Sequence, residues 1–186
     1  ACSIIRLGSR SRLFFRRSWS HIREDATDVT VLWFVKRGSM AVSHQGGYSI
    51  ARAGDFAITK SMTPFSMECQ TDDESRFEVL HVVVPTHVFR QIVPHDAGTG
   101  FSVSGQAREF RIAERILMDV FQDSDALAEH IEQLLVDSAL AVLADALKGC
   151  SGSAPVRQTL ADKRLQDVLR FIQIHLSDPK LSTMMV

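Results

Sequence analysis

Residues 26–84 alternate hydrophobic and polar positions over short stretches, a pattern that predicts β-strands. "TDVTVLWFVKRG" is rich in β-branched and aromatic residues and ends at Gly38. "SMAVSHQGGYSI" alternates around Gly46-Gly47, which predicts a two-residue hairpin that sets Gln45 opposite Tyr48. "RFEVLHVVVP" is apolar on both faces, as is typical of a strand covered on both sides. Many short strands with closely spaced turns predict an antiparallel barrel or a double-sheet jelly roll.

After Pro85 the hydrophobic pattern changes to the period of helices, and two long helices are predicted. The second, over residues 125–148, carries two apolar stripes about 180° apart at 100° per residue. One stripe contains Leu127, Ile131, Leu134, Ser138 and Ala141. The other contains Val136, Leu140, Leu143 and Leu147. The first stripe can lie on the preceding helix or on the barrel, and we assign the second to dimerisation with another copy of the chain. The alternative is that one subunit covers both stripes.

The C-terminal part of the chain changes character once more. "KGCSGSAPVRQTLAD" is small, polar and broken by Gly and Pro, as is typical of an interdomain linker. A single amphipathic helix follows, and Ser177-Asp178-Pro179 ends it. Leu181-Ser182-Thr183 is typical of the entry to a second helix. One helix and a stub cannot bury a core of their own, so this unit is expected to be incomplete.

Composition narrows the class of protein. Of the 186 residues, 45% are hydrophobic and 23% are charged, which argues against wholesale disorder. The net charge of -1 favours no particular partner. Three cysteines without CxxC spacing argue against a disulfide scaffold and a zinc site. No apolar run approaches the ~20 residues of a membrane span, and the N-terminus has no signal-peptide pattern. We expect a soluble cytoplasmic protein with no membrane contact.

Charge is uneven at the N-terminus. Residues 1–23 hold six arginines and no acid. This segment is either an arm that contacts an anionic group or a strand docked on a sheet. The aromatic and apolar content of "RLFFRRSWSHI" favours the docked strand.

The order of these parts resembles the AraC/XylS family of bacterial transcription regulators. The motif "VLRFIQIHLSDPKLS", residues 168–182, is similar to the start of that family's C-terminal DNA-binding domain. "GSMAVSHQGGYSIARAGDFAITKSMTPF", residues 38–65, is similar to the cupin-like N-terminal domain of one branch. The resemblance implies an α+β fold: an antiparallel cupin-like β-barrel (jelly roll), an α-helical pair, a linker and one helix of a truncated helix-turn-helix domain. The expected units are an N-terminal arm or strand at 1–24, a barrel at 25–105, a helical dimerisation hairpin at 106–148, a linker at 149–162 and an incomplete DNA-binding domain at 163–186.

The resemblance also implies a function. The chain would be the effector-sensing and dimerisation region of a regulator that binds promoter DNA through recognition helices beyond Val186. We therefore expect a homodimer, a possible small-molecule effector and no DNA-binding residue within the chain itself. The Arg-rich segment would be a switch element if it folds over the mouth of the barrel. A metal-free cupin module that serves only dimerisation is the main alternative.

A metal-dependent cupin enzyme is a further alternative. A cupin metal site needs a His-x-His pair, a Glu and a later His. Gln45 and Gly46 follow His44, so the pair is missing, and Pro64-Phe65-Ser66-Met67 stand immediately before Glu68, where a second His would be needed. Neither a Ser/His/Asp or Cys/His grouping nor a Gly-rich phosphate loop is suggested by spacing. We expect no catalytic residue, no metal and no cofactor.

An effector would need apolar walls with a few polar groups. Trp33 and His81 are the preferred pair, because each combines an apolar ring with a hydrogen-bonding tip. Alternation places His81 on one face with Phe77, Val79 and Val83, and plain core packing is the alternative role for each candidate. The full set of candidate ligand-binding residues is Trp33, Met40, His44, Phe56, Phe65 and His81.

Overall fold

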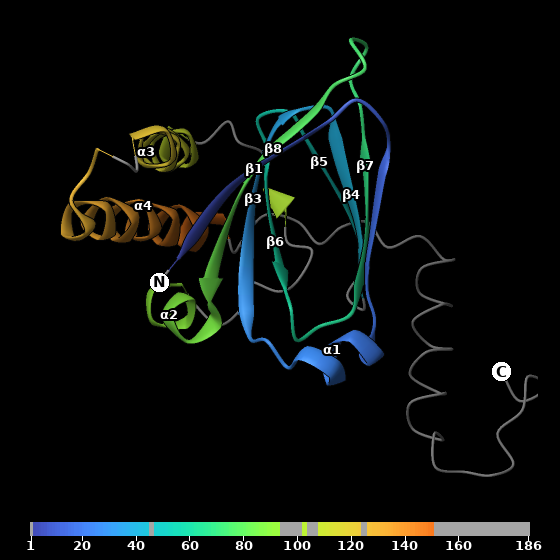
Figure 1. Ribbon diagram of the computed structural model, residues 1–186, viewed down its shortest axis with the longest axis horizontal. Coiled ribbons are helices and arrows are strands. Elements are labelled where there is room, and N and C mark those ends of the chain that lie inside the picture. Colours follow the sequence, from blue (N-terminus) through green and yellow to red (C-terminus); the bar gives the residue numbers. More distant parts are fainter. Residues whose placement is uncertain (1, 45–46, 94–101, 104–107, 124–125, 151–186) are drawn as a thin grey trace, which may run out of the picture.

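The computed structural model describes residues 2–44, 47–93, 102–103, 108–123 and 126–150, and shows two antiparallel sheets packed face to face (Figure 1). The five-stranded sheet has the order β1 (Ser3–Ser9), β8 (Phe77–Pro85), β3 (Val29–Arg37), β6 (Phe56–Lys60) and β9 (Ser102–Val103). The four-stranded sheet has the order β2 (Leu13–Arg17), β7 (Phe65–Gln70), β4 (Ser39–His44) and β5 (Gly47–Arg52). The predicted jelly roll is confirmed.

Four helices lie outside the sheets in the described part of the chain. They are α1 (Trp19–Asp25), α2 (Thr86–Ile92), α3 (Arg108–Asp123) and α4 (Glu129–Cys150). The α3–α4 pair and α2 lie on the outer side of the five-stranded sheet, whereas the four-stranded sheet carries no such layer (Figure 1). None of the described helices is long and apolar enough to cross a membrane. The predicted closing helix and most of the predicted linker lie outside the described residues.

Strand β8 shows why this sequence forms a two-layered core. Leu80, Val82 and Val84 alternate toward the helices, while Phe77 and Val79 point between the sheets. Because the helices cover one face of β8 and the second sheet covers the other, the residues on both faces can be apolar, as the sequence predicts. The core therefore has two parts, one beneath the helices and one in the interior of the jelly roll.

The N-terminal segment contributes strands to both sheets. β1 pairs with β8 and β2 pairs with β7, each in antiparallel register. This confirms the docked strand expected for "RLFFRRSWSHI" in its first half. Arg17 at the end of β2 donates hydrogen bonds to the Asp25 carboxylate at 2.5 Å and to the Ser61 carbonyl at 2.9 Å. The hydrogen bond from Arg17 lowers the pKa of Asp25 to about 2. These contacts fix α1 against the turn that follows β6.

The register of the β4–β5 hairpin differs from the sequence prediction by one residue. His44 pairs with Gly47 and Ser43 pairs with Tyr48, so Gln45 does not lie opposite Tyr48. Gly47 has a φ of +138°, a conformation that glycine adopts readily and other residues rarely do. The second glycine of the pair therefore begins β5 rather than occupying the loop.

The prediction that the second stripe of α4 mediates dimerisation is wrong. Val136, Leu140, Leu143 and Leu147 are at most 4% exposed and pack within the same chain. They cover the outer face of the five-stranded sheet together with Phe110 and Leu117 of α3. The other stripe faces outward, with Ile131 37% and Leu134 60% exposed. The helix does carry two apolar faces, but the one assigned to the partner is the one that the chain itself buries.

Candidate ligand-binding site

The jelly-roll interior brings together five of the six candidate ligand-binding residues. Trp33 and Met40 belong to the cluster between the sheets, and Phe65 packs against it. By strand alternation, His44 shares a face with Met40, and His81 shares a face with Val79. Phe56 is the exception and is not a wall residue. Its ring lies beneath the helices, 5.0 Å from the Phe34 ring and 5.3 Å from the Phe110 ring between centroids.

Trp33 and His81 form a cross-strand pair at the centre of the five-stranded sheet. They are directly opposite each other on β3 and β8, and their ring centroids lie 5.0 Å apart at 45°. The indole Nε1 of Trp33 donates a hydrogen bond of 2.9 Å to Oγ1 of the buried Thr59. Thr59 is not one of the site residues predicted from the sequence. The signal available in the sequence is that the small Ala57 and Thr59 alternate with larger apolar residues along β6. The indole is thus fixed by a side chain, and its face remains toward the imidazole.

The imidazole of His81 is the interior group whose bonding is incomplete. Its Nδ1 is buried and has no hydrogen-bond partner among the described residues. Leaving such an atom unpaired costs about 1–3 kcal/mol, so an orphaned nitrogen requires an explanation. Burial lowers the pKa of His81, and likewise that of His44, because an apolar environment disfavours the imidazolium. The His81 ring is therefore neutral at pH 7 and able to accept or donate one hydrogen bond.

The other inward-facing positions of β1–β8 are apolar or weakly polar. Alternation places no Asp or Glu on the inner faces of these eight strands. Burial raises the pKa of the Cys69 thiol to about 12, so this interior cysteine stays protonated. On the inner faces of β1–β8, the groups that can carry positive charge are His44, His81 and Arg17, of which Arg17 already pairs with Asp25.

The inner faces of the two edge strands β1 and β2 are partly accessible, whereas the centre of the interior is buried. Val35, Met40 and Val79 are at most 1% exposed. Ile5 of β1 is 44% exposed and Phe15 of β2 is 38% exposed, although both face the interior. Ile5 is paired with His81 in the β1–β8 register. The accessible inner face of β1 therefore lies next to the imidazole of His81. The sequence pattern does not predict this feature.

The described residues contain no group of three or more His, Cys, Asp or Glu side chains that could hold a metal ion. Glu68 alternates with Met67 and Cys69 and so lies on the outer face of β7. There its carboxylate pairs with Arg12 at 2.6 Å, which lowers its pKa.

The two interior histidines predict how stability depends on pH. Their pKa values are lower in the folded chain than the usual 6.5. The unfolded chain therefore takes up protons first as pH falls, so stability is constant above about pH 6.5 and decreases below it. We expect Tm to fall between pH 7 and 5, above the range where the carboxylates titrate. His81→Phe should flatten this profile, and His87→Gln on the exposed surface of α2 should not. Thermal unfolding of the wild type and of each variant across this pH range tests both expectations. If Tm depended on pH in the same way in the wild type and in His81→Phe, His81 would not be a source of the pH dependence.

Comparison with known structures identifies the fold. The AraC-like transcriptional activator CuxR superposes with a TM-score of 0.65 at 10% identity, covering 97% of this chain and 63% of CuxR. A variant of ToxT from Vibrio cholerae strain SCE256 has a TM-score of 0.54 at 10% identity, covering 98% of this chain and 67% of that protein. ToxT from Vibrio cholerae O395 has a TM-score of 0.50 at 6% identity, covering all of this chain and 71% of that protein.

These likenesses are in structure and not in sequence. No protein-family model matches the sequence, and no curated protein matches it. The chain spans less than two thirds of the length of CuxR. At such low identity the comparison concerns the fold alone: the chain has the cupin-like fold of AraC-like regulators, as the sequence resemblance implies.

Proposed function

We propose that this chain is the effector-sensing and dimerisation region of a transcription regulator of the AraC type. The observation that carries the sensing role is the buried, unpartnered Nδ1 of His81 beside the indole of Trp33. A polar atom kept without a partner in an apolar interior is explained if a ligand supplies the missing bond. The shared fold with CuxR supports the regulatory role. Promoter DNA would be the partner of the complete protein, through a domain that begins at residues 163–186.

The inward-facing groups favour an effector with an apolar body and one acidic head group. Met40, Val42 and Met67 offer an apolar wall, and Trp33 offers an aromatic one. The ionisable groups on the inner faces of β1–β8 are bases or the protonated Cys69, so a carboxylate would meet imidazoles, whereas an amine would meet no opposite charge. Binding of a carboxylate would stabilise the imidazolium form of His81 and take up a proton.

Thermal shift with matched acids and amines tests this function. We expect decanoic acid or phenylbutyric acid to raise Tm and decylamine or phenylbutylamine to leave it unchanged. His81→Phe should abolish the shift while raising the stability of the free chain by about 1 kcal/mol, because it removes the orphaned nitrogen. Met62→Ala, on an exposed side chain, is the matched control. If no small molecule in a broad screen shifts Tm, the chain is instead a metal-free cupin module that serves only dimerisation.

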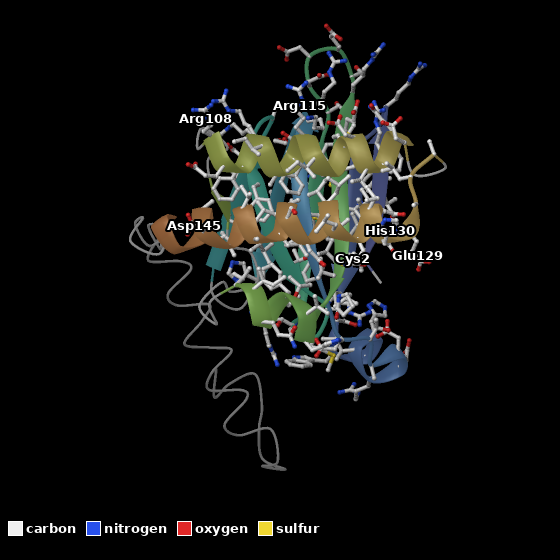
Figure 2. All side chains as sticks on the ribbon, turned by 90° about the vertical axis from the view of Figure 1, so that its left-hand side faces the viewer. Cys2, Arg108, Arg115, Glu129, His130 and Asp145 are labelled. Atoms are coloured by element: carbon white, nitrogen blue, oxygen red, sulfur yellow. The ribbon has the colours of Figure 1, made fainter. Side chains whose placement is uncertain are left out.

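We propose the outward stripe of α4 as the dimer contact. Ile131, Leu134, Ser138 and Ala141 recur at the three-and-four spacing of a helix–helix seam. Ile131 and Leu134 are exposed, and Ile112 of α3 adds an apolar side chain that is 43% exposed. Figure 2 views this helical layer face on, with Glu129 and His130 near one end of α4 and Asp145 toward the other. An antiparallel α4–α4 contact centred on Ser138 would place Leu134 of each copy against the small Ser138 and Ala141 of the other.

A further inference from the structure

Strand β2 is an edge strand whose outward backbone side is free in the described structure. It pairs only with β7, and β1, which precedes it, pairs only with β8. Figure 1 shows the two strands separating below the turn that joins them. Every second residue of an edge strand directs its N–H and C=O away from the sheet, so β2 offers a template for one more strand.

The outer face of β2 carries positive charge around an exposed aromatic ring. Arg12, Phe14 and Arg16 follow one another at two-residue intervals, about 7 Å apart along an extended chain. Phe14 is 66% exposed, and the Arg12 side chain is 69% exposed although it pairs with Glu68. Arg16 is exposed and forms no ion pair with a described residue. Two of these three outward positions are arginines, and the unpaired charge of Arg16 favours an anionic partner.

The inner face of the same strand is apolar and also accessible. Phe15 points toward the interior, as does Leu13, yet it is 38% exposed. Ile5, on the inner face of the other edge strand β1, is 44% exposed. Most exposed edge strands hide their apolar side chains, whereas β2 leaves a phenylalanine accessible on each face.

We propose that β2 binds an extended peptide segment of a partner protein in which acidic and apolar residues alternate. The segment would pair with the free backbone of β2 and extend the four-stranded sheet. Its acidic side chains would lie on the outer face against Arg12 and Arg16, and its apolar side chains would cover Phe15 and Ile5. Strand alternation requires this division between the two faces.

Charge disfavours a second copy of β2 as the occupant in the register that pairs the whole strand. In an antiparallel pair of two β2 strands centred on Phe14, the Arg12 of each copy lies opposite the Arg16 of the other. Like charges directly opposite each other destabilise a sheet. The arginines thus select an acidic strand against self-pairing.

The proposal stands independently of the effector. Because Ile5 is registered against His81, a bound strand would also cover the accessible side of the interior. Peptide binding and effector binding would then influence each other, but peptide binding to the free chain needs no effector.

A synthetic peptide tests the proposal. The probe is fluorescein-labelled Glu-Val-Glu-Phe-Glu-Val-Glu, titrated with the 186-residue chain and followed by fluorescence anisotropy. We expect saturable binding, and at least tenfold weaker binding when lysine replaces every glutamate or when alternate backbone nitrogens are methylated. Hydrogen exchange should slow at residues 13–17 when the peptide is bound.

Variants separate the recognition from general charge effects. Arg16→Ala should weaken binding about threefold to fivefold, as expected for one exposed ion pair, and the double variant with Arg12→Ala should weaken it further. Arg23→Ala, which removes an exposed arginine of α1, should leave the affinity unchanged. Thermal unfolding of each variant checks that the fold is intact.

Three results would overturn the proposal. They are equal affinity for the methylated peptide, an Arg16→Ala variant that binds as the wild type does, and displacement of the peptide by duplex DNA at lower concentration than by unlabelled peptide. Failure of the acid and amine screen on wild-type chain would leave the peptide result standing, so the two proposals fail separately.

Discussion

Gly38→Ala is expected to destabilise the chain by about 3–5 kcal/mol, a large share of the stability of a domain of this size. Gly38 connects β3 to β4 with a φ of +77°, and a left-handed backbone costs an alanine about 1–2 kcal/mol. A Cβ at this position would lie 2.2 Å from the backbone carbonyl oxygen of Gln70 and 3.2 Å from the Phe77 ring. Since Gln70 is held in the β4–β7 ladder, the clash cannot be relieved by rotating a side chain.

Gly54→Ala is the matched control for this substitution. Gly54 has a similar positive φ of +89°, but nothing lies within 4 Å of the added Cβ. We therefore expect a cost of only about 1 kcal/mol, from the backbone conformation alone. Urea unfolding of both variants separates steric conflict from backbone strain. Equal losses in the two would mean that the approach of Gln70 to Gly38 is not what requires glycine.

The same turn shows what the sequence could and could not predict. A glycine after "TVLWFVKR" correctly marks the end of a strand, because short strands end at turn residues. It does not reveal that the Gln70 carbonyl, 32 residues later, lies over that glycine. Likewise, Gly46-Gly47 correctly marks a hairpin, but two adjacent glycines fit the turn in either register, and the observed one differs by a residue.

Strand alternation predicts which candidate site residues share a face of one strand, but no more of the site than that. Placing His81 with Val79 follows from its spacing on one strand, and that part is confirmed. Which face of a strand points inward does not follow when both faces are apolar. Phe56 and Ile58 on one side of β6 and Ala57 and Thr59 on the other are all buried, so the residue type of Phe56 does not tell which face it occupies. The pairing of Trp33 with His81 depends on register between strands 48 positions apart, which no local pattern encodes.

Both faces of α4 are apolar, so the sequence pattern does not tell which face is buried within the subunit. Substitutions on the two faces distinguish a role in folding from a role in dimerisation. Leu140 is fully buried against the five-stranded sheet and α3. We expect Leu140→Ala to cost about 3 kcal/mol and Leu140→Glu to prevent folding, because a carboxylate would have to enter the core unpaired. Leu134, on the outward stripe and 60% exposed, should tolerate alanine within about 0.5 kcal/mol.

The informative contrast is Leu134→Glu against Leu140→Glu. Leu134→Glu should leave the unfolding transition unchanged but convert a dimer to a monomer, because it places two carboxylates in the proposed α4–α4 contact. Light scattering over a concentration series gives the mass, and circular dichroism gives the folded fraction. A wild-type chain that stays monomeric at every concentration, or a Leu134→Glu variant that stays dimeric, would exclude this stripe as the interface. A soluble, folded Leu140→Glu monomer would instead place the dimer contact on the inner stripe. A residue buried within its own subunit could not accept a carboxylate and leave the fold intact, whereas a residue in the dimer interface could.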